Sequence, residues 1–224
     1  MAKRAIRFYF DYISPNAYLA WTQLPALANR HQVTIEPVPV LFAGLLEAHR
    51  QLGPAEVPAK MHWMWKNALR KAALLGVELN PPAFHPFNPL LALRVSSLVL
   101  SLRDQNTLID ALFAAVWVRG LHLAEQAVMT RVINEAGLDG AQMVAQAQQP
   151  DAKARLRDQT DSAIALGIFG VPTVVFGSEM FWGYDDLPFV ERALSGLDAL
   201  NSEQLQKWSA VGASAARARK QAPG

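Results

Sequence analysis

Alternating hydrophobic and polar positions open the chain. Residues 6–10 alternate with a period of two, which predicts a β-strand. Apolar residues then recur at helical spacing from Ala17 to about Arg30, behind a Ser14-Pro15 pair that suits a helix start. Residues 33–36 alternate again and are closed by prolines at 37 and 39. This βαβ order predicts two parallel strands joined by a helix.

The long middle of the chain, from about residue 42 to 167, has a helical pattern throughout. Glycines at 76, 137 and 167 mark helix ends, because glycine readily adopts the left-handed conformation that ends a helix. The spacing predicts helices over 60–75, 88–103, 106 or 107 to 120, 125–136, 140–148 and 151–166.

Strand patterns return near the C-terminal end. Residues 173–176 and 179–182 are separated by Gly177-Ser178, which predicts a hairpin. Asp186 is expected to cap a helix over 187–194, and a last helix is predicted over 202–219. We therefore expect an α/β fold of order βαβ…ββα with a large all-helical insertion. The expected sheet domain comprises 1–41 and 168–200, the inserted domain 42–167 and a C-terminal helix or tail 201–224.

Composition and charge narrow the class of protein. Of 224 residues, 51% are hydrophobic and 18% charged, a globular balance, and the net charge is only +2. This positive charge is small, and several of the basic residues (Arg217, Arg219, Lys220) are confined to the tail. Because binding to nucleic acid needs a stronger and more extended positive surface, we expect no nucleic-acid partner. The apolar run over 90–102 is too short to span a bilayer, and Arg7 with Asp11 interrupts any signal-peptide core. We expect no membrane contact and a cytoplasmic setting.

The chain contains no cysteine. A disulfide framework is therefore excluded, and so is thiol–disulfide exchange by the protein's own sulfur. Its five histidines are scattered, and no pair has metal-ligand spacing with a carboxylate helper, so we expect no metal site.

Ser14 is the first candidate for chemistry. It suits the N-cap of the first helix, where serine is common for structural reasons alone. The same position presents free N–H groups and a partial positive charge, which favour a bound thiolate. A serine hydroxyl there can donate a hydrogen bond to that thiolate. An acyl-transfer role has less support, because no Gly-x-Ser-x-Gly motif surrounds Ser14.

Two later segments can likewise have either a purely structural role or a role in ligand binding. Val171-Pro172 is either an ordinary loop before a strand or a cis turn whose Val171 backbone groups pair with an extended peptide. Residues 181–186 form either a loop with an N-cap at Asp186 or a ligand loop. In the second case Gly183 permits close approach, and Asp185 pairs with a ligand ammonium group.

Together these motifs resemble the kappa-class glutathione transferase family, which includes the bacterial 2-hydroxychromene-2-carboxylate isomerases. The resemblance covers roughly residues 4–196 and is carried by 8–15, 53–60, 85–89, 170–173 and 180–183. It implies a thioredoxin-like fold in which Ser14-Pro15-Asn16-Ala17 takes the place of the redox Cys-x-x-Cys. It also implies glutathione as cofactor, a homodimer and an aromatic ketoacid substrate.

The resemblance assigns roles to particular positions. Ser14 becomes the catalytic residue that hydrogen-bonds the glutathione sulfur. The implied glutathione-binding residues are Ser14, Gln51, Lys60, Val171, Pro172, Trp182, Gly183, Tyr184 and Asp185. The implied substrate-binding residues are His49, Glu56 and Phe87.

The chain departs from the family at one place. Some relatives carry a lysine and an asparagine in the first inserted segment, where this chain has Leu46 and Gln51 or Glu56. Lys60, His49 and Arg50 are candidate replacements. The expected reaction is the interconversion of 2-hydroxychromene-2-carboxylate and trans-o-hydroxybenzylidenepyruvate. A transferase that conjugates electrophiles and a non-catalytic binding protein are the alternatives.

Overall fold

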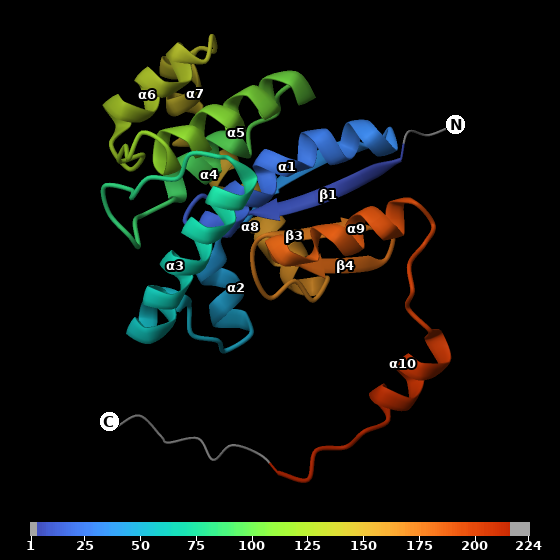
Figure 1. The fold of residues 1–224 in the computed structure, drawn as a ribbon. Coiled ribbons are helices and arrows are strands. Elements are labelled where there is room, and N and C mark those ends of the chain that lie inside the picture. Colours follow the sequence, from blue (N-terminus) through green and yellow to red (C-terminus); the bar gives the residue numbers. More distant parts are fainter. Residues whose placement is uncertain (1–3, 216–224) are drawn as a thin grey trace.

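A four-stranded mixed sheet forms the centre of the molecule in the computed structural model, which describes residues 4–215 (Figure 1). The strand order is β2-β1-β3-β4. β1 and β2 are parallel, whereas β3 is antiparallel to both β1 and β4. The strands are β1 (Ala5–Phe10), β2 (Thr34–Pro39), β3 (Thr173–Phe176) and β4 (Glu179–Trp182). The predicted βαβ unit and the predicted hairpin are therefore confirmed.

The helices fall into three groups along the chain. α1 (Pro15–His31) joins β1 to β2, and α9 (Leu187–Leu194) follows β4. α10 (Ser202–Ser209) stands away from the body in Figure 1. Between β2 and β3 lie α2 (Phe42–Ala48), α3 (Pro58–Leu75), α4 (Leu90–Ser96), α5 (Leu102–Trp117), α6 (Gln126–Glu135), α7 (Gly140–Ala147) and α8 (Pro150–Ala165). Two short 3₁₀ turns, η1 (Pro54–Glu56) and η2 (Tyr184–Asp186), precede α3 and α9.

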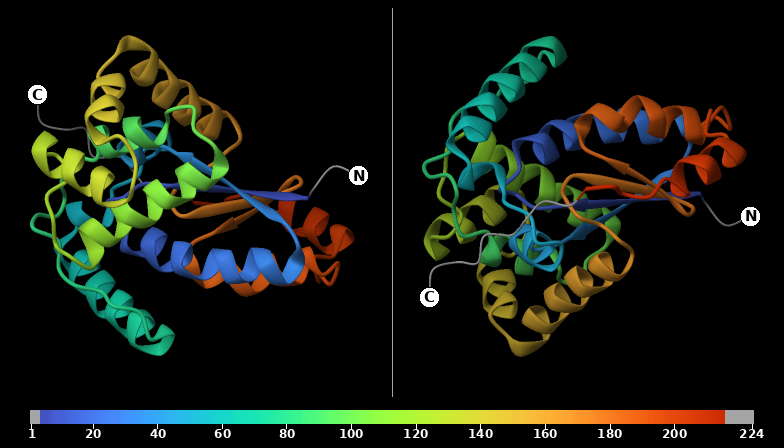
Figure 2. Two further views of the ribbon diagram at one scale, coloured as in Figure 1. Left: turned by 90° about the horizontal axis from the view of Figure 1, so that it is seen from above. Right: turned by 90° about the horizontal axis from the view of Figure 1, so that it is seen from below.

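The two faces of the sheet carry different helices. α1 and α9 lie on one side and α8 on the other (Figure 2). Alternate residues of β1, among them Phe8 and Phe10, join the larger core with α1 and α5, while Tyr9 packs with α2 and α8. The Phe10 and Phe113 rings are 5.6 Å apart, so strand β1 and helix α5 share one core. The domain boundaries near 41 and 168 stay a prediction.

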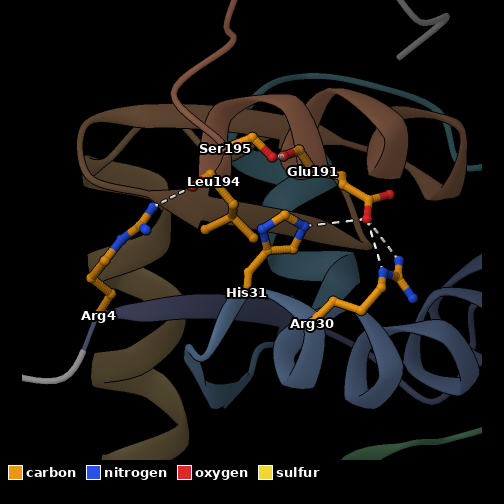
Figure 3. A network of polar contacts seen from close by, with 6 residues as sticks. All are labelled: Arg4, Arg30, His31, Glu191, Leu194 and Ser195. Carbon is orange, nitrogen blue, oxygen red and sulfur yellow. Dashed lines mark hydrogen bonds and ion pairs between the residues drawn. The ribbon is translucent and has the colours of Figure 1, made fainter.

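Polar contacts attach α9 to the far end of α1 (Figure 3). Glu191 Oε1 lies 2.9 Å from Arg30 Nη2 and 3.2 Å from His31 Nε2, and Arg4 donates to the Leu194 carbonyl at 2.8 Å. Hydrogen bonds and charge from Arg30 and His31 lower the pKa of Glu191. Because Arg30 and Glu191 are exposed, these contacts fix orientation more than they add stability.

The structure corrects the bounds of three predicted helices. The helix predicted over 88–103 ends at Ser96, and α5 begins at Leu102 rather than at 106 or 107. Ser101 causes this early start, because its Oγ accepts a hydrogen bond from the Asp104 N–H at 3.1 Å. The last helix ends at Ser209 rather than 219, and the basic residues of the tail lie outside the described residues.

Strand β2 also runs further than predicted, through Pro37 and Pro39. β2 is an edge strand, where a missing N–H costs no pairing on the open side, so prolines are tolerated there. No helix within residues 4–215 combines the length and apolar character needed to cross a membrane.

The shared core makes Phe113 a test of the fold. Its ring contacts Phe10, Tyr12 and Tyr18 and is 1% exposed. We expect Phe113→Ala to lower the free energy of unfolding by about 3–5 kcal/mol in urea titrations, in one transition. The control Phe189→Ala, at a side chain 57% exposed, should cost below about 0.5 kcal/mol. A separate transition of the helical segment would contradict the shared core.

Candidate active site

Ser14 stands at the start of α1 with its hydroxyl hydrogen available. Its backbone is extended (φ −94°, ψ 115°), and its Oγ accepts a hydrogen bond from the Ala17 N–H at 3.2 Å. Pro15 follows at the first helical position. Since the Oγ acts as acceptor toward the helix, its O–H can donate to a group placed beyond the N-terminus, where the helix dipole favours negative charge.

The loop before β3 forms the opposite wall. The Val171–Pro172 peptide is cis, and within residues 4–215 no group hydrogen-bonds the backbone N–H or carbonyl of Val171. The Gly183 N–H donates to the Pro172 carbonyl at 2.8 Å, which ties this loop to the end of β4. Gly183 has φ +92°, a conformation that glycine adopts without strain.

Trp182 closes over this loop. Its indole lies so close to Gly170 that a Cβ at that position would be 2.5 Å from Nε1. The indole also contacts the Phe169 ring, with centroids 5.0 Å apart. Glycine at 170 is therefore required for the observed place of the tryptophan.

A cavity of about 520 Å³ separates the two walls. It is mainly apolar, and Lys60 is the one lysine or arginine among the described residues that line it. Asp11, Asn16, Leu46 and His85 also line it, although they were not among the predicted binding residues. The predicted residues that the structure does bring to the cavity are Ser14, Gln51, Glu56, Lys60, Phe87, Val171 and Trp182.

Other predicted residues lie outside the cavity lining. The His49 ring pairs with the Ile168 carbonyl at 3.0 Å, and Arg50 follows at the end of α2. Pro172, Gly183, Tyr184 and Asp185 border the site without lining the cavity. Glu56 lines it, yet its Oε2 accepts from the Gly53 N–H at 2.6 Å and so holds η1.

Asp185 is connected to the cavity lining by Lys71, a residue that the sequence analysis missed. Lys71 on α3 donates to Asp185 Oδ2 at 2.7 Å and to Asn16 Oδ1 at 3.2 Å. Its Nζ also lies 5.0 Å from the centre of the Tyr184 ring. No local motif marks Lys71, because its partners are distant in sequence.

Comparison with known proteins shows the family to which the chain belongs. A model of the DSBA-like thioredoxin domain matches residues 5–195. The chain belongs to this DsbA-like thioredoxin family. A 2-hydroxychromene-2-carboxylate isomerase of Sphingobium xenophagum is 30% identical over 194 residues, covering 85% of this chain and 98% of the relative. Glutathione S-transferase kappa 2 of Caenorhabditis elegans is 26% identical over 183 residues, covering 76% and 80%.

Solved structures agree with the sequence relatives. A structure of 2-hydroxychromene-2-carboxylate isomerase superimposes with a TM-score of 0.80 at 27% identity, covering 92% of this DsbA-like chain and all of the other. The family resemblance and the thioredoxin-like fold expected from the sequence are thereby confirmed. The two sequence relatives described above are named as an isomerase and a transferase, so this DsbA-like chain is of an enzyme family.

The loop that leads into α1 is fixed from the helical segment. Trp117 Nε1 donates to the Tyr12 carbonyl at 3.0 Å, and His85 Nε2 pairs with the Ile13 carbonyl at 3.1 Å. Since a carbonyl only accepts, His85 carries its proton on Nε2. Burial lowers the pKa of His85, which keeps the ring neutral, and its Nδ1 has no partner among the described residues.

Asp11 is the buried acid of this DsbA-like site. Its side chain accepts from the Ile13 N–H at 3.1 Å and the Phe42 N–H at 3.0 Å. Burial raises its pKa to about 7, although both hydrogen bonds oppose the shift. A carboxyl group with this pKa in the cavity wall can exchange a proton at neutral pH.

The raised pKa of Asp11 predicts a pH-dependent stability. The folded state holds this proton up to about pH 7, whereas the unfolded value is 3.8. The stabilisation is complete below the unfolded pKa and is lost as pH rises through the folded pKa, by up to about 4 kcal/mol. In urea titrations from pH 5 to 8, Asp11→Asn should remove this decline.

The quantity to compare is the slope of the unfolding free energy against pH. The substitution Asp11→Asn also replaces one hydrogen-bond acceptor, which changes the stability at every pH but leaves the slope unaffected. Asp158→Asn, at an exposed aspartate, is the matched control and should keep the wild-type slope. An unchanged slope in Asp11→Asn would show that Asp11 is already ionised near pH 5.

Proposed function

We propose that this chain is a glutathione-dependent isomerase that interconverts 2-hydroxychromene-2-carboxylate and trans-o-hydroxybenzylidenepyruvate. One observation carries the proposal: the Ser14 hydroxyl at a helix N-terminus lines the same cavity as Val171, whose backbone has no hydrogen-bond partner within residues 4–215, in a chain without cysteine. The isomerase named among the relatives supports the reaction class.

The residues present fit glutathione in three respects. The cavity volume lies within the range of small-molecule sites, about 300–1,000 Å³. The N–H and carbonyl of Val171, which no described residue hydrogen-bonds, match the extended backbone of a short peptide. The start of α1 favours a thiolate, whose pKa falls from about 8.5 at such positions. Bound there, glutathione would supply a thiolate that adds to the conjugated double bond of the ring-opened ketoacid; the resulting single bond can rotate, and the double bond forms again when the thiolate leaves.

The chain's own groups prepare that chemistry. The Ser14 O–H donates a hydrogen bond to the sulfur and stabilises its ionised form. Lys60 offers a positive charge for a carboxylate of glutathione or of the substrate, and Phe87 provides an apolar wall for an aromatic ring. Because isomerisation consumes no thiol, these groups have only to bind, orient and stabilise charge.

A kappa-class transferase activity is the second candidate, since a kappa-class transferase is also among the relatives. Both activities would use Ser14 and Val171 and would differ in the acceptor end of the cavity, where Leu46 stands in place of a polar residue. Product analysis separates them. The isomerase returns free glutathione, whereas the transferase leaves a stable thioether.

Removal of the Ser14 hydroxyl tests the proposal. We expect Ser14→Ala to lower turnover of the chromene substrate at least tenfold in the presence of glutathione, because a donor to the thiolate is lost. Ser101→Ala is the matched control: it removes the N-cap of α5, away from the cavity. Each variant should lose about 1 kcal/mol of stability.

Turnover must therefore fall in Ser14→Ala alone. Equal activity of the two variants would refute a catalytic role for Ser14 and favour the non-catalytic binding protein. Full wild-type activity after thorough removal of glutathione would refute the cofactor.

A further inference from the structure

Asp11 is a buried acid without a counter-charge in the wall of the candidate site. Its side chain is 1% exposed, and it lines the same cavity as Ser14. Its two hydrogen-bond partners among the described residues are the backbone N–H groups of Ile13 and Phe42, which are uncharged. No lysine, arginine or histidine within residues 4–215 forms an ion pair with it. A carboxylate at this place is therefore held by neutral hydrogen bonds alone.

The protonated form of Asp11 needs a partner that the described residues do not supply. A protonated carboxyl group is itself a donor, whereas the N–H groups of Ile13 and Phe42 only donate. No acceptor within residues 4–215 is hydrogen-bonded to the Asp11 side chain. An acceptor for the proton has to come from the cavity that Asp11 lines. This places the exchangeable proton of Asp11 in relation to whatever the cavity binds.

A thiolate beside Ser14 would bring a second negative charge to this wall. Asp11 and Ser14 belong to one turn, in which the Ser14 N–H donates to the Asp11 main-chain carbonyl at 3.1 Å. Two like charges that share a buried site disfavour each other, so such a pair retains one proton. The N-terminus of α1 stabilises charge at Ser14, whereas burial opposes charge on Asp11 and raises its pKa to about 7. The retained proton therefore belongs on Asp11.

The two titratable groups nearest to this turn are less suited to hold that proton. Burial lowers the pKa of His85, so its ring accepts a proton less readily than an exposed histidine does, and its Nε2 already donates to the Ile13 carbonyl. The Tyr12 hydroxyl is paired with Ser96 Oγ at 2.7 Å, and burial raises its pKa, so it stays protonated. Neither group competes with Asp11.

Charged groups on the neighbouring elements form no hydrogen bond or ion pair with Asp11 within the described part of the chain. They are Glu56 of η1, Lys60 and Lys71 of α3, and Asp110 of α5. The lysine ammonium groups have no site that accepts a proton. Glu56 is exposed, and water stabilises its charged form. Asp110 accepts from Trp21 Nε1 and does not line the cavity.

We infer that Asp11 takes up the proton that glutathione loses when its thiol ionises beside Ser14. In this step the S–H bond breaks and an O–H bond forms on a carboxyl oxygen of Asp11, directly or through one water in the cavity. The number of protons and the net charge of ligand and site together stay the same. This inference rests on the proposed function and gives the thiol proton a destination within the chain.

Counting the protons released on binding tests the role of Asp11. Calorimetric titrations with glutathione in buffers of different ionisation enthalpy give this count. At pH 8 a free thiol is about three-quarters protonated. Asp11 is mostly ionised at that pH and can accept the proton. We expect the wild type to release almost no protons at pH 8 and Asp11→Asn to release about three-quarters of a proton per glutathione.

Two controls isolate the thiol proton. Asp158→Asn, at an exposed aspartate of α8, should give the wild-type count. S-methylglutathione has no thiol proton, so the wild type and Asp11→Asn should give equal counts with it. Equal counts for these two proteins with glutathione itself would overturn the inference, because Asp11 would then have no part in the ionisation.

The wild-type chain provides a second measure that needs no substitution. At pH 6 Asp11 already holds its proton, so the thiol proton has to pass to the buffer. The count should therefore fall from about one proton at pH 6 to almost none at pH 8. A count that does not change between these pH values, or that falls only to about three-quarters, would overturn the inference.

The inference and the proposed function fail in different ways. Saturable binding of glutathione by the wild type with either of those proton counts refutes the inference alone. Absence of glutathione binding by the wild type at millimolar concentration refutes the proposed function, and the inference with it.

Discussion

The hydrogen bonds that hold the loop of residues 11–14 are the constraint on which the site depends. This loop ends β1 and aims the N-terminus of α1 at the cavity, so its conformation decides where the Ser14 hydroxyl stands. Trp117 and His85, both from the helical segment, donate to consecutive carbonyls of the loop. The Asp11 side chain fixes the loop from within by accepting from the Ile13 N–H. Sheet and helical segment therefore position the first turn of α1 together.

Two polar groups beside this loop are buried at a cost in folding free energy. The carboxyl group of Asp11 is buried, and the Nδ1 of His85 has no partner among the described residues. Burial of such groups costs free energy, which the aromatic packing around Phe113 helps to offset. Departures of this kind concentrate at functional sites, where geometry matters more than stability. The packing of the shared core thus complements the hydrogen bonds that hold the loop of the site.

Features that depend on neighbouring residues could be predicted from the sequence, whereas contacts between residues distant in the chain could not. Ser14 and Gly183 follow from helix capping and backbone freedom, and the βαβ…ββα order follows from hydrophobic periodicity. Lys71 could not be found in this way, because it lies 55 residues from Asn16 and 114 from Asp185 and meets them only in the folded chain. The early start of α5 was missed because Ser101 caps that helix within a run that was assigned to one longer helix.

The ionisation state of bound glutathione is the most direct test of the central claim. Thiolates absorb in the ultraviolet, and the absence of cysteine from the chain removes any background from protein thiols. Free thiols, with a pKa of about 8.5, are largely protonated at pH 7. The account predicts that mixing the protein with glutathione at pH 7 produces thiolate absorbance that saturates with binding. Saturable binding without that absorbance would contradict it, because the start of α1 would then hold a neutral thiol.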